Sequence, residues 1–333
     1  MEIFQLWRAE DVAQAVGAAA YAEDRQGSTV RFLAGGTTLI DLMKLDVERP
    51  AMVIDISHLP LDRIEATPGG GVRIGAMVRN SDLAHDPLIR ERYPVLSQAL
   101  LSGASAQLRN MATTGGNLLQ RTRCVYFRDV AMPCNKREPG SGCPAIGGYN
   151  RNLAVLGTSE ACIASNPSDM NVALMALGAT IDIQGPGGAR TVAIDDFFVL
   201  PGDTPQRETV LEEGELITHV TLPALPAGTR SHYLKLRDRA SYEFALASAA
   251  VVVTMANGSI QAARVAMGGV GTRPWRSPPA EVLLAGGAPS AAVFDAAARE
   301  LLREARPQSQ NAFKIELARR CLVHALDTVT AAG

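Results

Sequence analysis

The first half of the chain alternates short runs of β-branched residues with helical patterns of hydrophobic positions. This rhythm is typical of layers of strands and helices. The alanine-rich stretch at 11–23 shows the helical spacing most clearly, and acidic residues fall in its first turn. The elements predicted here are, in chain order, a helix at 11–23, a strand at 29–34, a turn at 35–37, a helix at 38–44, strands at 52–56 and 72–77, and helices from 80 to 101.

The hydrophobic periodicity disappears from Gln120 to about Ala161, where Gly, Pro, Asn, Arg and Cys accumulate. So long a stretch without regular secondary structure is unusual inside a compact protein, and something must stabilise it.

Regular patterns resume after this segment. They predict a strand at 162–165, a helix at 171–177 capped by Ser168, and a strand at 180–184. Pro223, Pro226 and Gly228 indicate a domain boundary. Beyond the boundary the chain predicts strands at 233–237, 246–255 and 259–267, a hairpin turn at 256–258, and helices at 279–284, 291–305 and 311–329.

Composition narrows the function classes. A chain of 333 residues with 47% hydrophobic positions has room for two or three packed domains. The 32 basic and 34 acidic residues leave a net charge of −2, so nucleic acid is not an expected partner. The longest apolar stretch, about 244–256, is too short to span a bilayer, so we expect a soluble protein without membrane insertion. The first residues also lack the order of a secretory signal.

Four of the five cysteines lie within one 39-residue window, separated by nine, eight and eighteen residues. They are Cys124, Cys134, Cys143 and Cys162. Structural zinc usually uses closely paired cysteines, and disulfides need an oxidising compartment. A [4Fe–4S] cluster held by four thiolates would explain how so long a loop is ordered, because metal binding contributes folding energy. The residues favour the cluster but leave zinc, disulfides and four unrelated buried thiols open. Cys321 lies in a helical pattern and is expected to be a core thiol.

Two glycine-containing turns are candidates for binding phosphate. One is Ala34-Gly35-Gly36-Thr37-Thr38, and the other is the run 112–117, Ala-Thr-Thr-Gly-Gly-Asn. Glycine lets backbone N–H groups approach a phosphate closely. Neither turn matches the G-x-G-x-x-G or Walker patterns, which disfavours a classical dinucleotide fold or P-loop. Together the two turns suggest a diphosphate held between two loops, as in FAD.

Four motifs, in this order, resemble the FAD-binding subunits of molybdenum hydroxylases, the xanthine dehydrogenase family. They are RFLAGGTTLIDLMK, SAQLRNMATTGGNL, SDMNVALMALGA and YLKLRDRASYEFALASAAV. The cysteine-containing stretch between the second and third motifs is similar to that of the [4Fe–4S]-bearing flavin subunit of periplasmic aldehyde oxidoreductase.

The resemblance implies an α+β fold. It consists of a PCMH-type FAD-binding fold with two α/β subdomains, followed by a C-terminal domain with a three-stranded antiparallel sheet and helices. The implied domains are 1–225, with a subdomain break near 57–62 and a cluster-binding insertion at about 120–162, and 228–330.

The resemblance also implies cofactor-binding residues. Ala34, Gly35, Gly36, Thr37 and Thr38 would bind the FAD pyrophosphate through backbone amides, and the second loop would add Thr113, Gly116 and Asn117. Asp169 would hydrogen-bond the nucleotide portion, and Lys235 would approach the flavin ring. From the residues alone, Asp169 would be a simple helix-capping residue and Lys235 a solvated lysine. The family likeness supports Cys124, Cys134, Cys143 and Cys162 as ligands of a [4Fe–4S] cluster.

The function implied is electron transfer within a multisubunit aldehyde oxidoreductase. A molybdenum-cofactor large subunit and a [2Fe–2S] small subunit would supply electrons, which would pass through FAD and the [4Fe–4S] cluster to an external acceptor. Two alternatives stay open: a stand-alone flavin oxidoreductase of the PCMH group, and a flavin-free iron–sulfur scaffold or redox sensor. The resemblance implies a periplasmic location by co-export with a signal-bearing partner, the alternative being the cytoplasm.

Overall fold

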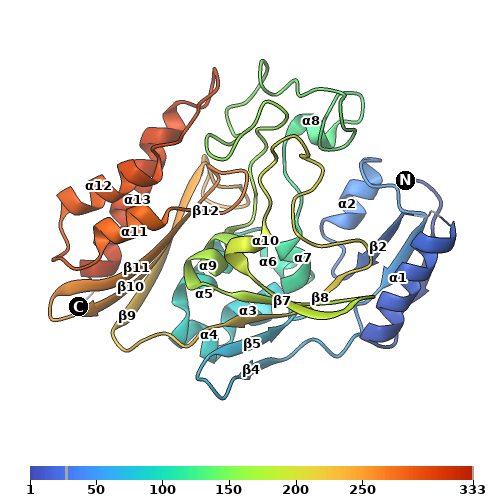
Figure 1. Cartoon of the computed structure of the whole chain (residues 1–333), viewed down its shortest axis with the longest axis horizontal. Helices are drawn as coiled ribbons and strands as arrows, with labels where there is room; N and C mark the ends of the chain where they lie inside the picture. Colours follow the sequence, from blue (N-terminus) through green and yellow to red (C-terminus); the bar gives the residue numbers. More distant parts are fainter. Residues whose placement is uncertain (27–28, 332–333) are drawn as a thin grey trace.

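The computed structural model describes residues 1–26 and 29–331, and its strands form three sheets. The first sheet is parallel, with strand order β1-β3-β2, and is formed by β1 (Gln5–Arg8), β2 (Val30–Leu33) and β3 (Met52–Asp55). Helix α1 (Val12–Gln26) packs on β2 and β3 through buried alanines, and α2 (Leu39–Lys44) follows β2. Figure 1 shows this unit, in blue, at one end of the molecule.

The second sheet is antiparallel throughout, with order β4-β5-β8-β6-β7. Its strands are β4 (Ile64–Ala66), β5 (Val72–Gly75), β6 (Thr180–Gly185), β7 (Gly188–Ala193) and β8 (Leu216–Leu222). Its accompanying helices are α3 (Asn80–His85), α4 (Pro87–Arg92), α5 (Pro94–Ser102), α6 (Ala106–Arg109), α7 (Thr114–Leu118), α9 (Asp169–Leu177) and α10 (Ile194–Phe197). The predicted helical stretch 80–101 is divided at Asp86 and Tyr93, because each precedes a proline, which disfavours helical geometry in the residue before it.

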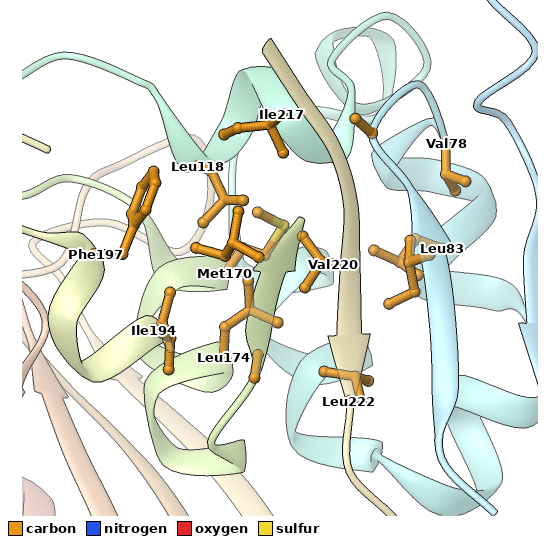
Figure 2. Packing of buried hydrophobic residues seen from close by; sticks show 14 of the residues in the cluster. Val78, Leu83, Leu118, Met170, Leu174, Ile194, Phe197, Ile217, Val220 and Leu222 are labelled. Atoms are coloured by element: carbon orange, nitrogen blue, oxygen red, sulfur yellow. The ribbon is translucent and has the colours of Figure 1, made fainter. Parts of the chain in front are cut away.

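Every residue of helix α9 is buried, and all of them except Asp169 and Asn171 in its first turn are apolar. It packs between α5 and the strands of the C-terminal sheet, and contributes to the largest hydrophobic core. Figure 2 shows Met170 and Leu174 of α9 on the same side of the core as Ile194 and Phe197, with Val220 of β8 between them and Leu83. This core anchors the start of α9, where Asp169 lies.

The third sheet has order β12-β11-β10-β9 and consists of β9 (Thr229–Leu236), β10 (Ala247–Ala256), β11 (Ser259–Gly268) and β12 (Trp275–Arg276). The predicted hairpin is confirmed: Asn257 and Gly258 both have positive φ in the tight turn between β10 and β11. Helices α11 (Pro278–Leu284), α12 (Ala291–Leu301) and α13 (Phe313–Ala331) cover one face, and α5 and α9 cover the other.

The α+β fold is therefore confirmed, with one correction: the C-terminal sheet has four strands rather than three. The extra strand, β12, is two residues long and pairs with Ala266 and Met267 of β11. A strand of two residues close to prolines shows no alternation of apolar and polar positions, so the sequence pattern does not predict it. The domain limits at 225 and 228 and the break near 57–62 stay predictions. Within the described ranges, no helix combines the length and apolar character needed to cross a membrane.

The segment from Gln120 to Ala161 is irregular as predicted, apart from the single turn α8 (Val125–Arg128). It lies at the top of Figure 1, between the C-terminal helices and α2. It has a small core of its own, in which Phe127, Leu153 and Ile163 pack with the clustered thiols. The predicted strand at 162–165 is wrong: this stretch has no ladder partner.

Candidate functional site: two glycine loops, two cavities and four thiols

The first glycine loop connects β2 to α2 and touches the second glycine loop. Gly36 has φ +72°, a conformation that favours glycine. A Cβ on Gly35 would lie 1.9 Å from the carbonyl oxygen of Met111, so only glycine allows the two backbones to come this close.

The second glycine loop is fixed to the sheet by its own backbone. The amide of Thr114 donates to Val78 O, and the amide of Gly115 donates to Ala76 O. Thr113 caps α7, and its hydroxyl accepts a hydrogen bond from the Gly116 amide at 3.2 Å. The loop is therefore held rigidly against the first one.

Both loops line a cavity of about 570 Å³, which lies in the usual size range for a cofactor pocket. Seven predicted residues line it: Ala34, Gly35, Gly36, Thr37, Thr38, Thr113 and Gly116. The sequence reasoning missed the opposite wall, which comes from 198–201 and 206–215. Glu208 of this wall joins a network of charged groups that line the cavity: Arg121 pairs with Glu48 at 2.6 Å and with Glu208, and Lys136 pairs with Glu208 at 3.0 Å.

Asn117, Asp169 and Lys235 are not on the wall of this cavity. Asn117 accepts a hydrogen bond from the hydroxyl of Ser168 at 2.8 Å, which connects the second loop to the start of α9. Asp169 lines a second cavity of about 190 Å³, which shares Ser165, Asn166 and Pro167 with the first. One elongated ligand with a diphosphate in its middle could extend from one cavity to the other.

Asp169 and Lys235 form a buried ion pair. Lys235 Nζ lies 2.7 Å from Asp169 Oδ2, and the two side chains are 3% and 9% exposed. Lys235 also donates to the carbonyl oxygen of Ser102. Asp169 and Lys235, which the resemblance assigns to the nucleotide portion and to the flavin ring of FAD, therefore contact each other.

Tyr233 completes this group and was missed by the sequence reasoning. Its hydroxyl donates to Asp169 Oδ1 at 2.5 Å. Burial, with the neighbouring Asp169 carboxylate, raises the pKa of Tyr233 well above its usual value. A signal was present, because residues two apart on a strand share a face, and Tyr233 and Lys235 both belong to β9.

Replacing Tyr233 with phenylalanine is expected to lower the free energy of unfolding by about 1.5–3 kcal/mol. That is the usual contribution of a hydrogen bond to a charged group. Urea denaturation of the wild-type and variant chains measures it. Tyr242→Phe is the control, because Tyr242 is exposed and the change keeps its aromatic ring. Equal losses in the two variants would contradict a special role for the Tyr233 hydroxyl.

The four clustered cysteines line one small cavity, together with Tyr126, Phe127 and Ala145 among others. All four are free thiols, and Cys321 lies apart from them in the C-terminal core. Burial raises the pKa of Cys124 to about 11, and it also raises the pKa values of Cys143 and Cys162. Thiolates are the form that binds metal, so a metal here would replace the protons of these thiols.

The four thiols are donors of the kind that an iron–sulfur cluster uses. No three His, Cys, Asp or Glu side chains of the described residues are close enough to hold one metal ion. A four-iron cluster separates its thiolate ligands, and this cavity contains four thiols with no histidine or carboxylate. The cavity is only about 10 Å³, so the thiol side chains would have to rotate outward around a cluster.

Several basic residues near the cysteines are held by other groups of the protein. Arg123 and Arg128 pair with Asp41, and Arg137 donates to the carbonyl oxygens of Tyr126 and Phe127. The charge of Lys136 partly offsets the effect of burial on the pKa of Cys162. Lys136, Cys162 and Ala164 line both the thiol cavity and the large cavity, so the two are separated by a single wall.

Comparisons with known proteins agree with this architecture. Residues 2–225 match the family model described as the FAD binding domain in molybdopterin dehydrogenase, and residues 232–329 match the CO dehydrogenase flavoprotein C-terminal domain. The aldehyde oxidoreductase FAD-binding subunit PaoB of Escherichia coli K12 is 53% identical over 297 residues, which are 89% of this chain and 90% of that protein.

More distant relatives share the same arrangement. The carbon monoxide dehydrogenase medium chain of Hydrogenophaga pseudoflava is 30% identical over 76% of this chain and 71% of its own length. A solved structure of carbon monoxide dehydrogenase from the same organism superposes with a TM-score of 0.78 at 27% identity, and covers 99% of this chain and 98% of that chain.

Proposed function

The chain belongs to the FAD-binding subunits of molybdenum hydroxylases, and on that premise we propose that it transfers electrons within an aldehyde oxidoreductase complex. As a family member it is an oxidoreductase subunit with an FAD-binding domain. In the proposed complex, a molybdenum-cofactor large subunit oxidises an aldehyde to a carboxylic acid. A [2Fe–2S] small subunit passes the electrons to this chain, which delivers them through FAD and a [4Fe–4S] cluster to an external acceptor.

The observation that carries this proposal is the single wall between the two cavities. Lys136, Cys162 and Ala164 face the large cavity on one side and the thiol cavity on the other. Leu153, which lines the second cavity, also packs with the thiols, so both cavities proposed for FAD adjoin the cysteines. Electron tunnelling weakens steeply with distance, so FAD extending through these cavities would be well placed to exchange electrons with a cluster at the thiols. A protein that used flavin alone would have no need of four buried thiols there.

The residues present fit both groups. Ala34 to Thr38, Thr113 and Gly116 would surround the FAD diphosphate with backbone amides and hydroxyls, while Asn117 would hold the start of α9 in place through Ser168. Lys235 would approach the flavin ring, and Asp169, which it contacts at the second cavity, would hydrogen-bond the adjoining nucleotide portion. Cys124, Cys134, Cys143 and Cys162 would ligate the cluster. When bound, FAD exchanges one or two electrons and the cluster exchanges one, and the chain fixes their distance and tunes their potentials.

The proposed partners follow from the relatives. The similar proteins are named as FAD-binding subunits or medium chains, names that place them beside other subunits. We assign the periplasm as the location, reached by co-export with a signal-bearing partner, the alternative being the cytoplasm.

The visible spectrum and the iron content of the anaerobically purified chain test the proposal. We expect flavin bands together with broad iron–sulfur absorption, about one FAD and four irons per chain, and no aldehyde oxidation without the partner subunits. Flavin without iron would instead support a stand-alone flavin oxidoreductase. Iron without flavin would support an iron–sulfur scaffold or redox sensor, and aldehyde oxidation by the chain alone would contradict the assignment.

A further inference from the structure

Lys314 is a fully buried lysine near the start of α13. Its Nζ donates to three carbonyl oxygens: Asn152 at 3.2 Å, Leu153 at 2.9 Å and Gly269 at 2.6 Å. A lysine ammonium has three N–H donors and no acceptor, so three carbonyls satisfy it completely. A neutral amine would leave one of these carbonyls without a donor. The hydrogen bonds therefore match the charged form.

The residues that bear these carbonyls lie beside the proposed cofactor sites. Asn152, Leu153 and Gly269 all line the second cavity, beside Asp169. Leu153 also packs against the thiols, in the small core of the cysteine segment. Lys314 thus holds a stretch of chain that faces the second cavity on one side and contacts the cysteines on the other.

Two buried asparagines add contacts between the residues just before α13 and the cysteine segment. The Asn311 amide donates to the carbonyl oxygens of Leu153 and Ala154, at 3.4 and 3.3 Å. Asn150 accepts from the Gln310 amide at 3.0 Å and donates to Ser309 Oγ at 3.2 Å. Both asparagines are fully buried. Hydrogen bonds from the C-terminal domain therefore hold residues 150–154 in place.

Burying the charged ammonium of Lys314 has a desolvation cost that lowers the stability of the fold. Burial lowers the pKa of Lys314 to about 7, and the positive charge of Arg151 adds to the effect. Methionine would fill similar space without desolvating a charge, but it would leave the carbonyl oxygens of Asn152, Leu153 and Gly269 without this donor. Hydrogen bonds to carbonyls offset part of this cost, but packing does not explain why the position carries an ammonium.

We propose that Lys314 is a positioning residue that holds 152–153 between the cysteines and the second cavity and sets the reduction potentials of the redox groups with its buried charge. The proposal rests on the proposed function. A positive charge stabilises the reduced form, which carries an additional electron, and a buried charge is screened far less than an exposed one.

Potentiometric titration of the complex containing Lys314→Met tests the proposal, with flavin and iron–sulfur absorption followed separately. We expect FAD and iron to be retained and the reduction potential of at least one group to fall. The equilibrium constant for its reduction should change about tenfold, which is about 59 mV for a one-electron step. Lys314→Arg, which keeps the charge, should restore most of the difference.

Arg320→Met is the matched control, because it removes a positive charge from the same helix at a side chain that is 73% exposed. It should leave both potentials at the wild-type values. Wild-type potentials in Lys314→Met with its cofactors retained would overturn the proposal. Equal loss of iron and FAD in Lys314→Met and Lys314→Arg would also overturn it, by showing that only packing matters. If the wild-type complex contains flavin but no iron, the cluster assignment fails while the flavin potential still tests Lys314.

Discussion

Replacing Cys143 with serine is expected to reduce the bound iron from about four atoms per chain to less than one. Serine is close in size to cysteine, but its hydroxyl stays protonated far above neutral pH and is a poor ligand for iron. Cys143 is the most exposed of the four clustered thiols, so the substitution disturbs the surrounding core least. Iron and FAD measured on the same purified sample would show loss of iron with flavin largely retained.

The fold of the cysteine segment should respond as well. Metal binding energy contributes to folding wherever the site does not exist in the unfolded chain. Residues 120–161 have one helical turn and a small core, so little else stabilises them. We expect trypsin to cut Cys143→Ser at the arginines of this segment several times faster than it cuts the wild-type chain.

Cys321→Ser is the control for the loss of iron. Cys321 is 1% exposed in the C-terminal core, and burial alone raises its pKa to about 12. A serine there will change stability slightly but should leave the iron content unchanged. Similar loss of iron in both variants would refute the assignment of Cys143 as a ligand.

The parts of the fold that the sequence predicted are those with strong local signals. The β10–β11 hairpin combines two apolar runs with Asn257 and Gly258, and its turn has the expected positive φ values. The breaks before Pro87 and Pro94 also had a local signal, because helical geometry is disfavoured in the residue before a proline. The hydrophobic pattern alone did not predict them. By contrast, β4 and β12 are three and two residues long, and such strands depend on partners that are distant in sequence.

The candidate site divides in the same way. The glycine loops and the clustered cysteines are local sequence features, and the structure brings each set to one cavity. The contacts of Lys235 with Asp169 and of Lys314 with Leu153 join residues 66 and 161 positions apart. A single sequence contains no signal for such pairs, because they are set by how the C-terminal sheet and α13 pack on the rest. The wall of the large cavity at 206–215 likewise carries no sequence motif, because packing of distant segments brings it to the cavity.

Substituting Gly35 with alanine is expected to weaken FAD binding at least tenfold and to lower the free energy of unfolding by about 1–3 kcal/mol. The added Cβ would lie 1.9 Å from Met111 O and 2.7 Å from its carbonyl carbon, which is closer than any non-bonded contact. Both atoms belong to the backbone, so no side-chain rotation relieves the clash, and overpacking of this kind has costs of that order. The two glycine loops must separate, and the proposed diphosphate site between them widens.

Gly17→Ala is the matched control for this substitution. Gly17 is an exposed residue of α1, and a Cβ there would meet nothing within 4 Å. Alanine should stabilise the helix by up to about 1 kcal/mol and leave FAD binding unchanged. Flavin content after purification and thermal unfolding with and without added FAD distinguish the two variants. If Gly35→Ala retained wild-type flavin affinity, the close contact of the loops would have no part in binding, and the proposed position of the diphosphate would have to be abandoned.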